Sequence, residues 1–354
     1  MSRFISSRFD SLREYVPGEQ PKERKYIKLN TNESPYPPSP ATAEAAAAAA
    51  KSCNLYSDPT LVSVRKCIAN LYGIKSENVI ITNGSDETLS FAFMAYCDEN
   101  TGAAFPDISY GFYPVFGKLY GLDCKRIPLK DDFSIDISDY FGLGRTIFIA
   151  NPNAPTGLTL TLSEIEEILK NNPDNIVVID EAYVDFGAES AVKLIDRYRN
   201  LLVVQTFSKS RSLAGARVGF GIASAEIIKD LDKLRNSTNP YNVNSMSLAA
   251  AAAALDDNEY YMLNCKKIQE SRKTMSDGLS TLGFELTASK ANFVFAKHPK
   301  ISGKELYSKL REEGVLVRHF DADRISEYNR ITVGSPDEVS ALLSACEKIL
   351  KGIN

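Results

Sequence analysis

Short apolar runs alternate with longer helix-forming segments along the chain as far as about residue 222. Each run is four to six residues long and almost free of charge, so both of its faces can be buried in a sheet. The predicted strands are residues 78–82, 102–105, 145–150, 175–180, 201–204 and 218–222. The clearest helices between them are residues 61–72, 87–96 and 163–170. This alternation predicts an α/β fold with a mostly parallel sheet sandwiched by helices, in which ligands bind beyond the carboxyl ends of the strands.

The last third of the chain has a different pattern. An alanine-rich segment, residues 247–255, runs into a polar helix that we expect to continue to about residue 282. Strands at residues 292–296 and 330–333 lie on either side of a helix at residues 303–313. This order of elements predicts a small α+β domain.

With 354 residues the chain exceeds one ordinary core, so we expect more than one domain. Residues 1–40 are rich in Pro, Asn and Ser and have no core pattern, whereas residues 41–51 are alanine-rich and helix-forming. We therefore predict an N-terminal arm (1–40) that packs with the small domain, a large domain (41–244) and a small C-terminal domain (245–354).

The composition narrows the classes of function. Charged residues make up 24% of the chain and hydrophobic residues 44%, as in ordinary globular proteins. A net charge of −4 disfavours nucleic acid and anionic membranes as partners. The chain has no apolar run of about 20 residues and no apolar segment near its start, so we expect a cytoplasmic protein. Its six cysteines lack paired spacing and it has two histidines, which predicts reduced thiols and no metal site.

Lys209 is the first candidate for chemistry. It follows the apolar run at residues 201–204 and stands among small residues and hydroxyls. Burial would lower the pKa of its amine, and a neutral amine can attack the carbonyl of a sugar or of pyridoxal phosphate. A solvated loop lysine is the alternative interpretation.

Unusual polar groups stand at the ends of other predicted strands. Asp180 ends a buried strand and needs a cationic partner, either a pyridinium N–H or a structural arginine. Gly84, Ser85 and Asp86 join a strand to a helix start, where backbone N–H groups bind anions, although simple helix capping would explain the same residues. Arg217 would supply a further phosphate contact.

These motifs together resemble the fold type I pyridoxal-phosphate aminotransferases. Asp180-x-x-Tyr183, Lys209 and Arg217 follow one another as in that family, and residues 151–157 are similar to its Asn-Pro-Thr-Gly turn. The resemblance implies an aspartate-aminotransferase-like fold with pyridoxal 5'-phosphate in the large domain. It implies that Lys209 binds the cofactor covalently and acts as general base. Asp180 would keep the pyridine nitrogen protonated, and Tyr183 would hydrogen-bond the ring 3′-oxygen.

The resemblance also implies the remaining cofactor contacts. Tyr110 would stack on the cofactor ring. The family usually has an asparagine where this chain has Ala154, so either Asn153 reaches the 3′-oxygen from one residue earlier or Tyr183 holds it alone. The residues expected to hold the phosphate are Ser85, Asp86, Thr206, Ser208 and Arg217.

Within this group the chain resembles the histidinol-phosphate aminotransferases along nearly its whole length. Tyr56 is then expected to reach the cofactor phosphate of the partner subunit in a homodimer. Arg330, with Arg318 and Tyr15, is expected to bind the carboxylate or phosphate of the substrate. The segments that carry the similarity are residues 29–40, 56–59, 239–244, 314–318 and 330–334.

The resemblance implies a transaminase of histidine biosynthesis that interconverts histidinol phosphate and 2-oxoglutarate with imidazole acetol phosphate and glutamate. An aromatic-amino-acid transaminase and a threonine-phosphate decarboxylase would use the same cofactor residues and remain alternatives. A regulatory module that binds the cofactor without catalysis is disfavoured, because Lys209, Asp180, Tyr183 and Arg217 are all present and no DNA-binding appendage is visible.

Overall fold

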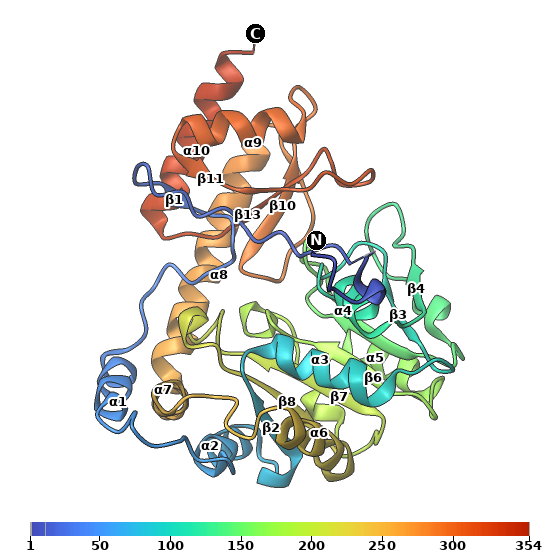
Figure 1. Cartoon of the computed structure of the whole chain (residues 1–354). Helices are drawn as coiled ribbons and strands as arrows, with labels where there is room; N and C mark the ends of the chain where they lie inside the picture. Colours follow the sequence, from blue (N-terminus) through green and yellow to red (C-terminus); the bar gives the residue numbers. More distant parts are fainter. Residues whose placement is uncertain (1, 11, 354) are drawn as a thin grey trace.

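A seven-stranded sheet forms the centre of the larger part of the molecule (Figure 1). The computed structural model describes residues 2–10 and 12–353. The strand order is β2-β8-β7-β6-β5-β3-β4, with β8 antiparallel to both neighbours and the other pairs parallel. The predicted α/β fold with a mostly parallel sheet is therefore confirmed. The strands are β2 (Val79–Thr82), β3 (Ala103–Pro106), β4 (Cys124–Ile127), β5 (Thr146–Ala150), β6 (Val177–Asp180), β7 (Leu201–Thr206) and β8 (Gly219–Ala223).

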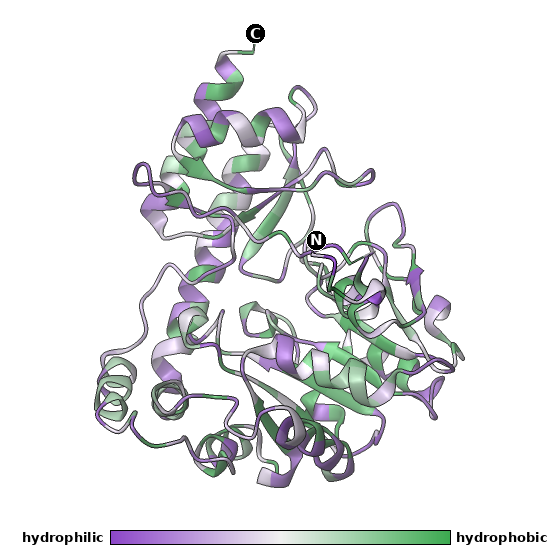
Figure 2. Cartoon of the chain, in the orientation of Figure 1, coloured by the Kyte–Doolittle hydropathy of each residue, from purple (hydrophilic) through white to green (hydrophobic). Residues whose placement is uncertain are grey.

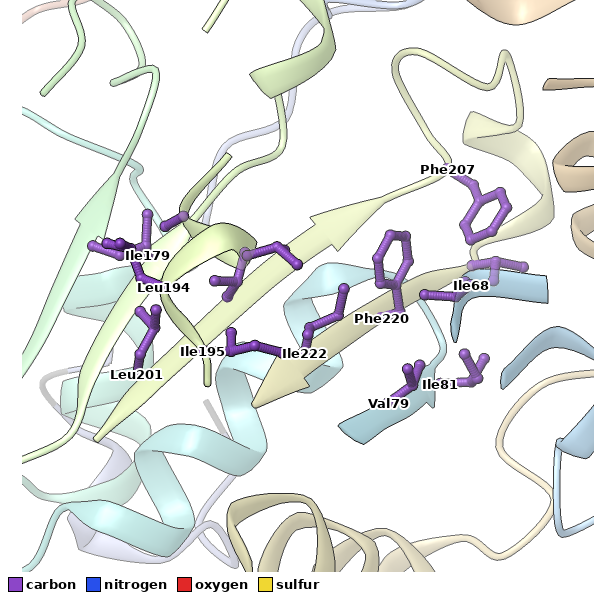
Figure 3. Packing of buried hydrophobic residues seen from close by; sticks show 14 of the residues in the cluster. Ile68, Val79, Ile81, Ile179, Leu194, Ile195, Leu201, Phe207, Phe220 and Ile222 are labelled. Carbon is purple, nitrogen blue, oxygen red and sulfur yellow. The ribbon is translucent and has the colours of Figure 1, made fainter. Parts of the chain in front are cut away.

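Both faces of this sheet are buried, which explains the nearly continuous apolar runs. Successive side chains of a strand point to opposite faces, so in β6 Val177 and Ile179 enter one apolar cluster and Val178 enters another. Figure 3 shows the first cluster, where Ile179, Leu201 and other strand residues meet side chains of the covering segments. The helices of this part are α1 (Pro40–Ala50), α2 (Val62–Tyr72), α3 (Ser85–Tyr96), α4 (Tyr113–Tyr120), α5 (Leu162–Lys170), α6 (Ala225–Thr238) and α7 (Ser245–Asp256).

A smaller antiparallel sheet lies above the large one in Figure 1, in the order β12-β13-β10-β9. The long helix α8 connects the two parts, and Figure 2 shows both hydrophilic and hydrophobic residues along it. Near the N-terminus, β1 pairs in parallel with β11, so the arm crosses to the C-terminal part. The elements are β1 (Ile27–Lys28), α8 (Asn258–Thr281), β9 (Glu285–Leu286), β10 (Phe293–Lys297), α9 (Gly303–Glu312), β11 (Val315–Leu316), β12 (Arg318–His319), β13 (Asn329–Thr332) and α10 (Pro336–Lys351).

Several local predictions need correction. The helix expected to run without a break to residue 282 is two helices, because Asp257 leaves the helical conformation (φ −96°, ψ 39°) between α7 and α8. The apolar pattern does not predict strand β4, because two of its residues, Lys125 and Arg126, are charged and exposed at the edge of the sheet. Short 3-10 helices were also not foreseen; they are Ser7–Phe9, Ser76–Asn78, Ile137–Tyr140, Val184–Phe186, Ala191–Leu194 and Ala214–Ala216.

Candidate active site

A cavity of about 990 Å³ lies at the carboxyl ends of β5, β6 and β7, where Ala150, Asp180 and Thr206 line it. Residues 13–18 of the arm and Arg330 of the smaller sheet close its other sides. Parallel strands place their carboxyl ends at one edge, so polar residues far apart in sequence meet there.

Lys209 lies in this cavity, just after β7. Its Nζ donates a hydrogen bond to the carbonyl oxygen of Thr31 at 3.1 Å. Burial lowers the pKa of Lys209 to about 8, and the positive charge of Arg330 acts in the same direction. Glu33 and Asp86 oppose this shift only in part. A substantial fraction of the amine is therefore neutral, and thus nucleophilic, slightly above neutral pH.

Asp180 ends β6 with its carboxyl group buried. Its Oδ2 accepts from the Tyr113 hydroxyl at 3.1 Å and its Oδ1 from the Ala182 N–H at 3.2 Å. Burial raises the pKa of Asp180 to about 7. Within the described part of the chain, no Lys, Arg or His forms an ion pair with it. A cationic N–H group of a ligand would supply the partner that this carboxylate lacks.

An anion-binding cradle lies at the start of α3. Gly84 precedes the helix with φ +80°, and a Cβ atom there would stand 2.5 Å from Nη2 of Arg217. The N–H groups of Ser85 and Asp86 have no acceptor among the described residues, so they are free to bind an anion. Arg217 Nη1 donates to Ser208 Oγ at 3.3 Å. These donors suit a phosphate monoester.

Neighbouring hydroxyl groups complete the anion-binding cradle, and an aromatic ring lies beside it. Thr206 Oγ1 donates to Ser208 Oγ at 3.0 Å, so both hydroxyls lie beside Arg217. Tyr110 lines the cavity and donates from its hydroxyl to Asp86 Oδ1 at 2.7 Å. This hydrogen bond fixes the Tyr110 ring beside the cradle, where it could stack on a planar ligand.

Tyr183 lines the cavity beside Lys209, whose Nζ lies 5.8 Å from the centre of the Tyr183 ring. The Tyr183 hydroxyl accepts a hydrogen bond from Asn32 Nδ2 at 3.0 Å. Asn32 was not identified from the sequence, and neither was Tyr113. No local pattern marks them, because each contacts a site residue far away along the chain.

Arg330 presents an unpaired cation to the cavity. Its Nη2 donates to Asn30 O at 3.1 Å, and its guanidinium lies 5.5 Å from the Phe293 ring centre and 5.8 Å from that of Phe320. Its Nε is buried without a partner, and no carboxylate of the described residues pairs with it. Burial lowers the pKa of Arg330. A guanidinium held in this way is suited to a carboxylate or a phosphate.

Arg318 and Tyr15 also line the cavity. Arg318 donates to the carbonyl oxygens of Val16 at 2.7 Å and Pro17 at 3.1 Å, so it ties the arm to the cavity wall. The Tyr15 ring stacks on Phe112 with centres 4.5 Å apart. The structure thus brings both residues to the site, with part of the hydrogen-bonding capacity of Arg318 already used.

Two predicted site residues do not line the cavity of their own chain. Asn153 Nδ2 donates to Ile108 O and to Thr156 Oγ1, both at 3.0 Å, and its Oδ1 accepts from Ser109 Oγ at 2.8 Å, so its amide is already used by residues 108–109 and by its own turn. The proposed reach of Asn153 to a ligand is therefore not seen; Ala154 lines the cavity instead. Tyr56 is 82% exposed and stacks on Tyr241.

Comparison with known proteins agrees with this geometry. The sequence profile of the family described as aminotransferase class I and II matches residues 24–346. The histidinol-phosphate aminotransferase of Brachyspira hyodysenteriae is 48% identical over 353 residues, covering 99% of this chain and 100% of that protein. That of Acinetobacter baylyi is 47% identical over 346 residues, covering 97% and 96%.

Solved structures show the same fold. The histidinol-phosphate aminotransferase from Sinorhizobium meliloti, in complex with pyridoxal-5'-phosphate, has a TM-score of 0.90 at 22% identity and covers 100% of this chain and 99% of that one. A mutant aspartate aminotransferase of Thermus thermophilus has a TM-score of 0.83 at 19% identity, covering 99% of both chains. Among residues 2–10 and 12–353, no helix is long and apolar enough to span a membrane, and no cluster of three His, Cys, Asp or Glu is placed to hold a metal ion.

Proposed function

Because this chain belongs to the histidinol-phosphate aminotransferases of aminotransferase class I and II, we propose that it interconverts histidinol phosphate and 2-oxoglutarate with imidazole acetol phosphate and glutamate. The observation that carries the proposal is one cavity that holds Lys209, with its lowered pKa, and Asp180, which lacks a cationic partner. We place the enzyme in the cytoplasm, with the cofactor in a large domain of residues 41–244 and the arm (1–40) and residues 245–354 closing the site.

The donors of the cavity fit pyridoxal 5'-phosphate, which when bound supplies an electron sink for bonds to the amine-bearing carbon. The cradle of Ser85, Asp86 and Arg217, with Thr206 and Ser208, would hold its phosphate. Tyr110 would cover its ring. The buried carboxylate of Asp180 would hold a proton on its ring nitrogen, and the ion pair would offset the cost of burying Asp180.

Lys209 has two roles in this proposal. Its neutral amine would hold the cofactor through the aldehyde group, and when a substrate amine takes that place the freed amine would accept the proton from the amine-bearing carbon of the substrate. A pKa near 8 suits both roles, because the amine is neutral often enough to attack and basic enough to accept a proton. Tyr183 would donate a hydrogen bond from its hydroxyl group to the 3′-oxygen of the ring.

Arg330 is the proposed anchor for substrate anions. We expect Arg330→Ala to lower kcat/KM for both histidinol phosphate and glutamate about a hundredfold, on the order of 3 kcal/mol, because each substrate loses a buried anion partner. Arg318→Ala should lower kcat/KM for histidinol phosphate at least as much. It also removes the hydrogen bonds to the carbonyl oxygens of Val16 and Pro17 that hold the arm. Single-turnover kinetics of the two half-reactions measures both effects.

The matched control for these variants is Arg199→Ala, whose side chain is 87% exposed and lies outside the cavity; it should behave as the parent does. Equal reactivity of free histidinol and its phosphate ester would mean that the cavity has no phosphate pocket. The aromatic-amino-acid transaminase would then be the better assignment.

Tyr56 leads to a prediction about assembly. It is exposed beside Tyr241 in its own chain, and we propose that in a homodimer it contacts the cofactor phosphate of the partner. Tyr56→Phe protomers mixed with Lys209→Ala protomers should then form dimers with one fully native site. After random exchange of subunits, activity should reach roughly a quarter of that of the parent from the native sites alone. Full activity in a strictly monomeric preparation would contradict the proposal.

Steady-state assays with histidinol phosphate, phenylalanine and threonine phosphate, each with 2-oxoglutarate, test the proposed reaction directly. We expect the highest kcat/KM with histidinol phosphate and the formation of glutamate. Preference for phenylalanine would favour the aromatic transaminase. Release of carbon dioxide from threonine phosphate without formation of glutamate would favour the decarboxylase.

A further inference from the structure

Three consecutive residues of the arm each contact a different residue of the site. The carbonyl oxygen of Asn30 accepts from Arg330 and that of Thr31 accepts from Lys209, both at 3.1 Å. The side chain of Asn32 donates to the Tyr183 hydroxyl at 3.0 Å. The first two contacts use the backbone, which any residue type provides. The contact of Asn32 depends on its side chain, so its chemistry can be tested by substitution.

The orientation of the Asn32 amide is set by Thr332 on β13. The Thr332 hydroxyl accepts from the Asn32 backbone N–H at 2.9 Å. Its single proton is therefore available to the side-chain oxygen of Asn32, which lies 3.1 Å away. With Oδ1 turned toward Thr332, the Nδ2 group faces Tyr183 as a donor.

The direction of this chain of hydrogen bonds decides where the Tyr183 proton points. Because the Tyr183 oxygen accepts from Asn32, its own proton is free to be donated to another acceptor. Asn32 is the only hydrogen-bond partner of that hydroxyl among the described residues, and Tyr183 lines the cavity. Burial raises the pKa of Tyr183, which keeps the hydroxyl protonated. The proton is thus directed into the cavity.

Among the described residues, no other side-chain amide hydrogen-bonds the Tyr183 hydroxyl. Ala154 packs in the same apolar cluster as Tyr183 and has no polar side-chain atom. The Asn153 amide already donates to Ile108 O and Thr156 Oγ1. Asn32 is also held rigidly: it is 1% exposed, and its carbonyl oxygen accepts from Asn292 Nδ2 at 3.0 Å.

We propose that Asn32 is a positioning residue that, oriented by Thr332, holds the Tyr183 hydroxyl so that it donates to the 3′-oxygen of the bound cofactor. This inference rests on the proposed function. It extends that function because it assigns a directional role to a residue of the arm, 151 positions from Tyr183 along the chain.

The backbone of Asn32 limits the choice of variants. Its φ is +55°, a left-handed conformation that Asn, Asp and Gly adopt more readily than Ala. Asn32→Gly therefore removes the amide without backbone strain. Asn32→Asp keeps the shape but replaces the donor with an acceptor, so the Tyr183 proton would turn toward the new carboxylate. Thr332→Val removes the hydroxyl that orients the amide, and Thr332→Ser keeps it.

In the experiment, the parent and each variant are loaded with pyridoxal phosphate. The visible absorbance of the bound cofactor is then measured as a function of pH, which gives the midpoint of its titration. A 3′-oxygen that no longer accepts a hydrogen bond from Tyr183 is more basic. Asn32→Gly and Asn32→Asp should therefore shift the pH midpoint of the titration upward. We expect kcat/KM to fall roughly tenfold for Asn32→Gly and further for Asn32→Asp. Thr332→Val should shift the midpoint in the same direction, whereas Thr332→Ser should match the parent.

A double-mutant cycle separates positioning from a merely structural role. If Asn32 acts through the Tyr183 hydroxyl, Asn32→Gly should cause no further shift when added to Tyr183→Phe. An unshifted midpoint in both Asn32 variants, or a full additional shift in the double variant, would overturn the inference. A parent protein that fails to bind pyridoxal phosphate would overturn the proposed function, and this inference with it. If the parent binds pyridoxal phosphate and transaminates, the proposed function stands, and the titration midpoints of the variants then test the role of Asn32 alone.

Discussion

Replacing Lys209 with alanine will lower the rate of both half-reactions roughly a thousandfold or more, while the protein still binds pyridoxal phosphate. The loss is large because one amine is proposed to act both as the covalent anchor and as the base that moves the substrate proton. Binding persists because the phosphate cradle at the start of α3 and the Asp180 carboxylate do not depend on Lys209. The parent should be yellow, with a visible band that borohydride bleaches irreversibly, and Lys209→Ala should lose this reaction with borohydride.

The pH dependence of cofactor binding gives a second measure of Lys209. Because only the neutral amine attacks the aldehyde, covalent attachment to cofactor-free protein should speed up with rising pH and level off above about 8, the pKa of Lys209. Lys273→Ala, at an exposed lysine of α8 that pairs with Asp277, is the control and should match the parent. A parent protein that stays colourless with added pyridoxal phosphate would refute the cofactor and the reaction together.

Asp180→Asn should slow proton removal from the substrate more than a hundredfold, with a much smaller effect on cofactor binding. The carboxylate holds the proton on the ring nitrogen in our proposal, and a neutral amide would lower the pKa of that nitrogen and weaken the electron sink. Stopped-flow measurement of the glutamate half-reaction tests this effect. A loss of activity within about tenfold, roughly 1.4 kcal/mol, would indicate that Asp180 is structural.

Although Asp180→Asn should impair catalysis, it should stabilise the folded, cofactor-free protein. Burial raises the pKa of Asp180 in the folded, cofactor-free protein to about 7, above the usual value of 3.8 for the unfolded chain. The folded state therefore binds more protons between these values, and this group makes the protein less stable as pH rises from about 4 to 7. Without cofactor, Asp180→Asn should be more stable than the parent at pH 8, by roughly 1.4 kcal/mol for each unit of the removed shift. Chemical denaturation at pH 5 and pH 8 measures the difference.

Glu181→Gln is the matched control for Asp180→Asn. Glu181 is the next residue, is equally buried, and also has a pKa raised by burial to about 7. Its oxygens accept from Ser190, the Ala191 N–H and Gln205, and it does not line the cavity. Glu181→Gln should therefore alter stability without altering the absorbance of the bound cofactor. A spectral change as large as that of Asp180→Asn would show that the two carboxyl groups are not functionally distinct.

Most of the large sheet could be predicted from the sequence. Apolar runs such as residues 175–180 are readable because the strands are buried on both faces, and the polar residue that follows or ends each run must lie at one edge of a parallel sheet. This rule predicts that Asp180, Lys209 and the start of α3 lie in one site. It failed for β4, where edge exposure permits charged residues.

Local sequence by itself therefore determined the strands that are buried on both faces, the sheet edge that carries the site, and the residue types at that edge. Only the tertiary structure decided which side chains are free to act there. Asn153 and Asn32 are both buried amides, yet the Asn153 amide is held by Ile108 and Thr156 and the Asn32 amide reaches Tyr183. Arg330 is available to a substrate because no acidic side chain of the described residues pairs with it. The physical reason is that strand and helix patterns depend on neighbours in the chain, whereas hydrogen-bond partners and unpaired charges depend on which distant segments pack together.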